Sequence, residues 1–182
     1  RMKPSSVHRY ITVVRAAVNY VISEHSLNIP NVFNGLRIKG ASASADDRLP
    51  MGDQDLVMAR PNFKDDPVAH ALFVTLTDTG ARLSEITGLE VQDVDLQERS
   101  ITIRPNSIRT LKTKGSQRTL PLSQSALEVL QEHRRGKGDT QPIFEDYARP
   151  RGRDAASAML MKRLRRSITD KKGTMHSLRH RM

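Results

Sequence analysis

The chain has 182 residues, a net charge of +10, no tryptophan and no cysteine. The lack of cysteine excludes disulfides and thiolate metal sites, and no apolar run reaches the roughly 18 residues of a transmembrane helix. The N-terminal Arg-Met-Lys-Pro lacks the apolar stretch of a signal peptide. We therefore expect a cytoplasmic protein with no membrane partner and a core of aliphatic side chains.

The charge is unevenly distributed along the chain. Residues 46–98 contain twelve acidic and four basic residues, whereas residues 148–182 contain eleven basic and two acidic ones. A basic protein with one concentrated basic segment is typical of nucleic-acid binding. A solvated surface with a biased tail is the alternative.

The first predicted element is an amphipathic helix over residues 5–25, started by a Ser5 or Ser6 cap. Its apolar positions recur at steps of three and four residues: Val7, Ile11, Val14, Val18 and Val21. Residues 39–47 are small and polar, which is typical of an interdomain linker. We predict the last helix of an N-terminal domain over 1–38, a linker over 39–47 and a second domain over 48–182.

The second domain is predicted to be mainly α with a small antiparallel β-sheet, an α+β fold. Helices are expected over 54–60, 67–78, 82–87 and 154–168, with a last one from His176. A further helix, capped by Ser123 or Ser125, is expected to run through Arg135. Strands are expected over 99–104 and 117–122. In the helix over 154–168 we expect an inward apolar face and an outward basic face: Leu160, Leu164 and Ile168 inward, and Lys162, Arg163, Arg165 and Arg166 outward.

Arg82 is one of the few basic residues in the acidic segment, and it follows the turn at Gly80. Glu85 lies three positions on, so both side chains share a helix face. An arginine presents a fork of donors that matches two phosphate oxygens, and a carboxylate on its other edge can hold that fork in place. A surface ion pair of little energetic value is the alternative.

Two further groups of residues could act on a phosphate. Lys112, Lys114 and Arg118 lie on the predicted β-hairpin, where a lysine can donate a proton to a leaving oxygen. His176 and Arg179 are three residues apart and suit a pentacoordinate phosphate, which needs charge stabilisation and proton transfer. A solvated basic loop and an ordinary helix start are the alternatives. No metal-ligand spacing and no Gly-rich phosphate loop are present.

The order of these motifs resembles the tyrosine recombinase, or phage integrase, family. Thr79-Gly-Ala-Arg82-Leu-Ser-Glu85 resembles its first catalytic box, the segment from Leu111 to Leu122 its hairpin lysine motif, and His176-Ser-Leu-Arg179-His180 its second box. The resemblance covers the chain from about residue 48 to the end. The predicted helix over 5–25 is similar to the last helix of the family's N-terminal core-binding domain.

The resemblance implies a site-specific recombinase that cleaves and rejoins DNA through a 3′-phosphotyrosyl link, without metal, ATP or other cofactor. Arg82 and Arg179 would hold the scissile phosphate, and Lys112, or alternatively Lys114, would be the general acid. His176 would assist and Glu85 would support the site. Arg118, Arg163 and Arg166 are the expected DNA-binding residues. The partners would be a double-stranded attachment site and sister protomers in a synapse, for integration of a phage or a genomic island.

The family's tyrosine and its third His or Trp lie downstream of the second box, and this chain ends at Met182 before them. Tyr10, Tyr20 and Tyr147 are not at the expected place, so we expect an inactive fragment of the catalytic domain. A type IB topoisomerase-like enzyme and a non-enzymatic DNA-binding protein are the alternatives. The sequence does not specify the DNA target.

Overall fold

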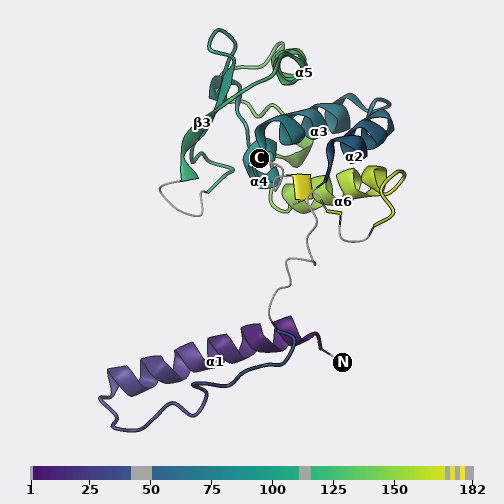
Figure 1. Ribbon diagram of the computed structural model, residues 1–182. Helices are drawn as coiled ribbons and strands as arrows, with labels where there is room; N and C mark the ends of the chain where they lie inside the picture. The colour runs from purple at the N-terminus through teal and green to yellow at the C-terminus, as the bar shows by residue number, and fades with distance from the viewer. Residues whose placement is uncertain (1, 42–50, 111–115, 171–172, 175–176, 179–182) are drawn as a thin grey trace. The chain divides into compact units, whose positions relative to one another are not determined.

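The computed structural model describes residues 2–41, 51–110, 116–170, 173–174 and 177–178 (Figure 1). The chain divides into two compact units, Arg1–Asp47 and Arg48–Met182. This division falls at the predicted start of the second domain, and the roles predicted for the two domains stay predictions. Most of the predicted linker lies outside the described residues.

The first unit contains one long helix, α1 (Pro4–Glu24), and the segment that follows it. The helix begins at Pro4, whose fixed φ suits the first helical position, so the predicted serine cap is wrong. Asn31 donates from Nδ2 to the Arg15 carbonyl at 3.0 Å, and Arg15 donates from Nε to the Phe33 carbonyl at 2.9 Å. These bonds fold the segment back along α1, which itself has no buried residue.

The second unit begins with α2 (Asp53–Ala59), η2 (Arg60–Phe63) and α3 (Pro67–Thr79). Asp66 caps α3 by accepting from the Ala69 amide at 3.0 Å. Helix α3 is buried on nearly every side, because it runs through the middle of the core between α5 and α6. The rings of Phe63 and Phe73 stack at a centroid distance of 4.1 Å and fix η2 against α3.

The short helix α4 (Leu83–Thr87) and η3 (Val91–Asp93) lead into a three-stranded antiparallel sheet. Its strands are β1 (Val94–Asp95), β2 (Ser100–Ile103) and β3 (Arg118–Pro121), in the order β1-β2-β3. Ile101 pairs with Leu120, and Ile103 pairs with Arg118. Ile101 and Ile103 point into the core because side chains alternate along a strand.

The remaining elements are α5 (Gln124–Arg134), η5 (Glu145–Tyr147) and α6 (Gly152–Leu164). Ser123, one of the two predicted caps, caps α5 by accepting from the Ala126 amide at 3.3 Å. Helix α6 packs against α4 and η5, and Leu160, Leu164 and Ile168 are buried as predicted.

The fold class predicted from the sequence is confirmed: the second unit is mainly helical with one small antiparallel sheet. The predicted hairpin turn and the predicted helix start at His176 fall on residues outside the described part of the chain. Within the described segments, no helix combines the length and apolar character that crossing a membrane needs.

Candidate functional site

Arg82 lies at the boundary between a left-handed turn and α4. Gly80 ends α3 with φ 58°, a conformation that costs a residue without Cβ little. Arg82 is then the N-cap of α4 with extended backbone angles, and its side chain is 36% exposed. The turn therefore presents a guanidinium group at the surface from a backbone fixed by the buried helix α3.

Glu85 holds Arg82 through two hydrogen bonds, as the predicted three-residue spacing implies. The Arg82 amide donates to Oε2 at 2.7 Å, and Arg82 Nη1 donates to Oε1 at 2.7 Å. The Glu85 side chain is only 3% exposed. This pair is therefore not the solvated surface ion pair that was the alternative, because its acidic member is buried.

Arg118 is the second cation on the same carboxylate. Its Nη2 donates to Glu85 Oε2 at 2.8 Å and its Nη1 donates to Oε1 at 3.2 Å. Nη1 also donates to the Ser116 carbonyl at 2.9 Å. The structure thus places Arg118, which the sequence predicts as a DNA-binding residue, in a bidentate pair with Glu85.

The surrounding groups keep Glu85 ionised. Burial alone would raise the pKa of its carboxyl, but the hydrogen bonds from Arg118 and Arg82 outweigh burial and lower this pKa from 4.5 to about 2. Two guanidinium groups therefore face one carboxylate at every physiological pH. An excess of positive charge beside an exposed arginine fork suits a phosphate.

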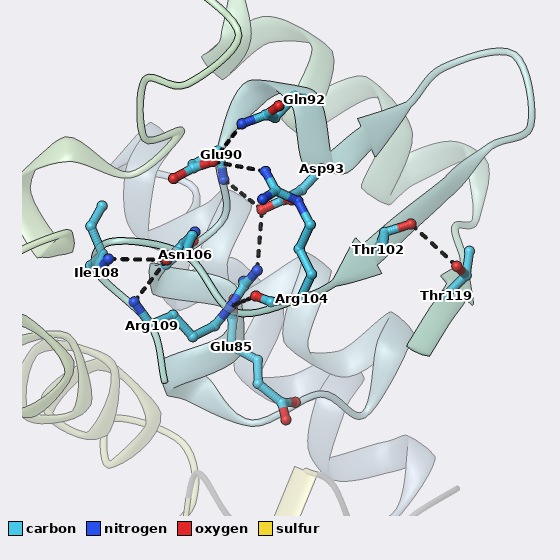
Figure 2. A network of polar contacts seen from close by, with 11 residues as sticks. Glu85, Glu90, Gln92, Asp93, Thr102, Arg104, Asn106, Ile108, Arg109 and Thr119 are labelled. Atoms are coloured by element: carbon cyan, nitrogen blue, oxygen red, sulfur yellow. Dashed lines mark hydrogen bonds and ion pairs between the residues drawn. The ribbon is translucent and has the colours of Figure 1, made fainter. Parts of the chain in front are cut away.

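A second network of charges reaches the backbone of Glu85 (Figure 2). Arg109 is 3% exposed, and its guanidinium donates to the Glu85 carbonyl at 2.7 Å, the Arg104 carbonyl at 2.8 Å and Asp93 Oδ2 at 3.2 Å. Arg104 in turn pairs with Glu90 at 2.8 Å and Asp93 at 2.7 Å. The positive charges of these two arginines are neutralised by the negative charges of the two carboxylates. Charged side chains can be buried only when they are paired in this way.

Glu85 joins the two networks through different atoms. Figure 2 shows its carboxylate pointing away from Arg109, whose bond is to the Glu85 backbone carbonyl. Arg109 lies just before residues 111–115 and Arg118 lies just after them. Both flanks of the segment that carries Lys112 and Lys114 are therefore bonded to the same residue of α4.

The four residues of this network, Arg104, Arg109, Glu90 and Asp93, are not among the site residues that the sequence predicts. Burial lowers the pKa of Arg109, and the neighbouring Asp93 opposes that shift, so the side chain stays charged inside the protein. The one local sign was Asn106, a turn former whose Oδ1 accepts from the Arg109 amide at 2.7 Å. A buried arginine has no periodic signature that would have revealed it.

Four of the predicted catalytic or supporting residues lie outside the described residues: Lys112, Lys114, His176 and Arg179. Their roles stay predictions. Two neighbours of the last pair are described, and Ser177 and Leu178 are 1% and 2% exposed. Ser177 Oγ accepts from the Thr174 amide at 3.0 Å. The second box therefore has its central residues anchored in the core.

The two DNA-binding candidates on α6 and just after it have different surroundings. Arg163 is 14% exposed and pairs with Asp65 and Asp66, so it does not point outward as predicted. Arg166 is 50% exposed, with its Nη1 3.8 Å from Asp65. Arg165 also folds inward and donates to the Gly173 carbonyl at 2.7 Å. Of the two candidates, Arg166 retains the accessible guanidinium.

Tyr147 is the one tyrosine of the second unit. It lines a groove of about 630 Å³ between α4 and the start of α6. Burial and the nearby Asp66 raise the pKa of its phenol, which opposes formation of a nucleophilic phenolate. Over the described residues, no group of three or more His, Cys, Asp or Glu side chains could hold a metal ion.

The site thus has an arginine at the N-cap of a short helix and a glutamate on that helix, beside a three-stranded sheet. The sequence model of the phage integrase family matches residues 54–182, and the chain belongs to this family. Tyrosine recombinase XerA of Pyrococcus furiosus is 26% identical over 112 residues, which cover 60% of this chain and 37% of that protein. Tyrosine recombinase XerD of Corynebacterium glutamicum is 32% identical over 117 residues, 60% of this chain and 36% of that protein. The match thus spans little more than a third of each curated relative.

Solved structures support the fold. The integrase of transposon Tn1549, in complex with a circular intermediate DNA, superposes with a TM-score of 0.71 at 18% identity, over 96% of this chain and 64% of that one. A lambda integrase tetramer bound to a Holliday junction gives a TM-score of 0.68 at 17% identity, over 93% of this chain and 50% of that one.

Proposed function

We propose that this chain carries the phosphate-binding part of a tyrosine-type site-specific DNA recombinase that integrates a mobile element, either a phage or a genomic island. The observation that carries the proposal is the Arg82 guanidinium, exposed to solvent and bonded from behind by the buried Glu85 carboxylate. Membership of the phage integrase family and similarity to two curated tyrosine recombinases support it.

The proposed reaction transfers one phosphoryl group twice. A tyrosine hydroxyl attacks the scissile phosphate, a bond from phosphorus to the tyrosine oxygen forms, and the bond to the 5′-oxygen breaks. Arg82 and Arg179 stabilise the charge on the non-bridging oxygens. Lys112, or alternatively Lys114, gives its proton to the departing 5′-oxygen. The phenolic proton leaves to His176 acting as proton carrier, or to water where His176 only donates a hydrogen bond. A free 5′-hydroxyl later reverses the step.

The nucleophile is proposed to come from sequence other than Tyr10, Tyr20 and Tyr147. The first two lie in the N-terminal unit, outside the residues 54–182 that match the family's sequence model, and the phenol of Tyr147 has a raised pKa. We infer that the 182-residue chain binds double-stranded DNA but forms no covalent adduct with it. Sister protomers are proposed as partners because the lambda integrase neighbour is a tetramer on a Holliday junction.

Because the match spans little more than a third of each curated relative, the proposal is tested by covalent trapping on a protein that includes the proposed nucleophile, called the full-length protein below. The substrate is a duplex attachment site with a nick next to the scissile phosphate, so that the released fragment diffuses away and the adduct persists. Arg82→Ala should reduce adduct formation on the order of 10²- to 10³-fold, the usual cost of losing one preorganised oxyanion donor. Arg99→Ala is the matched control, because Arg99 is exposed and bonds Gln124, away from the site.

Retained trapping by Arg82→Ala would contradict the assignment. Relaxation of supercoiled DNA by the protein alone, without recombination of paired sites, would favour a type IB topoisomerase. DNA binding with no adduct in the wild-type full-length protein would favour a non-enzymatic DNA-binding protein.

A further inference from the structure

In the described part of the chain, two arginines donate four hydrogen bonds to the Glu85 carboxylate. An ionised carboxylate offers about four lone-pair sites. Oε1 accepts from Arg82 Nη1 at 2.7 Å and from Arg118 Nη1 at 3.2 Å. Oε2 accepts from the Arg82 amide at 2.7 Å and from Arg118 Nη2 at 2.8 Å. Among the described residues, each arginine therefore supplies two of the four hydrogen bonds that the Glu85 carboxylate receives.

The two arginines come from different elements of the fold. Arg82 begins α4, whereas Arg118 is the first residue of β3 and pairs with Ile103 in the sheet. The bidentate bond from Arg118 fixes the plane of the carboxylate, because a fork of two parallel N–H donors permits only one orientation. The carboxylate then fixes Arg82. The sheet that carries Arg118 therefore fixes the orientation of the Arg82 guanidinium through Glu85.

We propose that Arg118 is a positioning residue for Arg82, acting through Glu85, and that it is not a DNA contact. This inference rests on the proposed function, in which Arg82 binds the scissile phosphate. It replaces the DNA-binding role that the sequence predicts for Arg118.

Loss of Arg118 would leave half of the acceptor capacity unfilled on a carboxylate that is only 3% exposed. Glu85 would then be free to rotate toward other donors, and Arg82 would follow it. A displacement of about 1 Å in a catalytic group can cost on the order of 100-fold in rate. DNA affinity, which depends on many phosphate contacts, would change little.

Single-turnover cleavage by the full-length protein tests the coupling. Arg118→Gln should slow cleavage about 10- to 100-fold. When it is added to Glu85→Gln, the cleavage rate should fall little further, because the effects of mutating two residues that act through one group are not additive. Arg118→Lys should recover part of the rate, because an ammonium keeps the charge and loses the planar fork. Arg99→Gln, which removes the same charge from an exposed position, should cleave like the wild type.

The salt dependence of DNA binding by the 182-residue chain tests whether Arg118 contacts DNA. Each lost phosphate contact reduces the slope of log K against log salt by about 0.9. Arg118→Gln should leave the slope at the value measured for Arg99→Gln. Thermal melts of each variant confirm that the fold is kept, and Arg118→Lys replaces Arg118→Gln if the latter does not fold.

Two results would overturn the proposal while leaving the proposed function intact. One is that Arg118→Gln slows cleavage by the same factor in the wild type and in Glu85→Gln. The other is that Arg118→Gln reduces the slope of log K against log salt by about 0.9. Absence of cleavage by the wild-type protein would instead overturn the proposed function, and this inference with it.

Discussion

Glu85 is the residue on which the candidate site converges. Its carboxylate accepts from Arg82 and Arg118, and its backbone carbonyl accepts from Arg109. Burial of a carboxylate is unfavourable unless hydrogen bonds and opposite charges compensate for lost hydration. Here they overcompensate, since the pKa of Glu85 falls to about 2. Glu85 thus contributes to stability as well as to the site.

The low pKa of Glu85 predicts a pH-dependent stability. Since its folded-state pKa lies below the unfolded value of 4.5, its contribution is complete above about pH 4.5 and is lost as the pH falls through about 2. We expect this contribution to be on the order of 3 kcal/mol. The measurement is the free energy of unfolding of wild type and Glu85→Gln in urea at a series of pH values.

The difference between the two proteins should shrink between about pH 5 and pH 2. Glu128→Gln is the control, because Glu128 is an exposed acid on α5. A difference that stays constant with pH would mean that the carboxylate is not held as described.

At the scale of elements, α6 depends on a close backbone contact at its start. A Cβ placed on Gly152 would lie 2.0 Å from the Tyr147 carbonyl oxygen and 2.6 Å from its carbonyl carbon. The chain therefore folds tightly from η5 into α6. Helix α6 packs against α4, so the contact at Gly152 also supports the helix that begins at Arg82.

Gly152→Ala is expected to be destabilising because backbone atoms would have to move apart. The cost should be about 1–3 kcal/mol, typical of overpacking. Gly138→Ala is the matched control, because a Cβ there would meet only a side-chain oxygen of Gln141 at 3.7 Å. Equal unfolding free energies of the two variants in urea would show that the contact is not constraining.

The sequence predicted well what depends on local spacing. The Arg82–Glu85 pair follows from a three-residue step on one helix face, and the caps and turns at Ser123 and Gly80 follow from residue type. It failed for contacts between distant residues. Arg118 lies 33 positions from Glu85 and Arg109 lies 24 positions from it, and no periodic pattern links them. Arg163 was expected to face solvent, but its partners on η2 and α3 come from about 100 residues earlier in the chain.

At the scale of the whole molecule, the second unit combines a neutral buried network with an exposed site of excess positive charge. The network of Arg104, Arg109, Glu90 and Asp93 fixes the segment before residues 111–115 to α4. Arg118 bonds the segment after them to the same helix. The residues on both sides of the proposed lysine segment are thus bonded to Glu85, which also holds Arg82. This arrangement suits a reaction in which phosphate binding and proton donation occur at the same phosphate group.

Arg82 is proposed to stabilise negative charge on the scissile phosphate, and one measurement tests this role most directly. Single-turnover cleavage by the full-length protein is compared on a normal site and on a site whose scissile phosphate is a neutral methylphosphonate. Arg82→Ala should reduce the cleavage rate on the order of 10²- to 10³-fold on the phosphate. It should reduce the rate far less on the methylphosphonate, which lacks the negative charge that Arg82 would stabilise. An equal loss on both substrates would contradict the account.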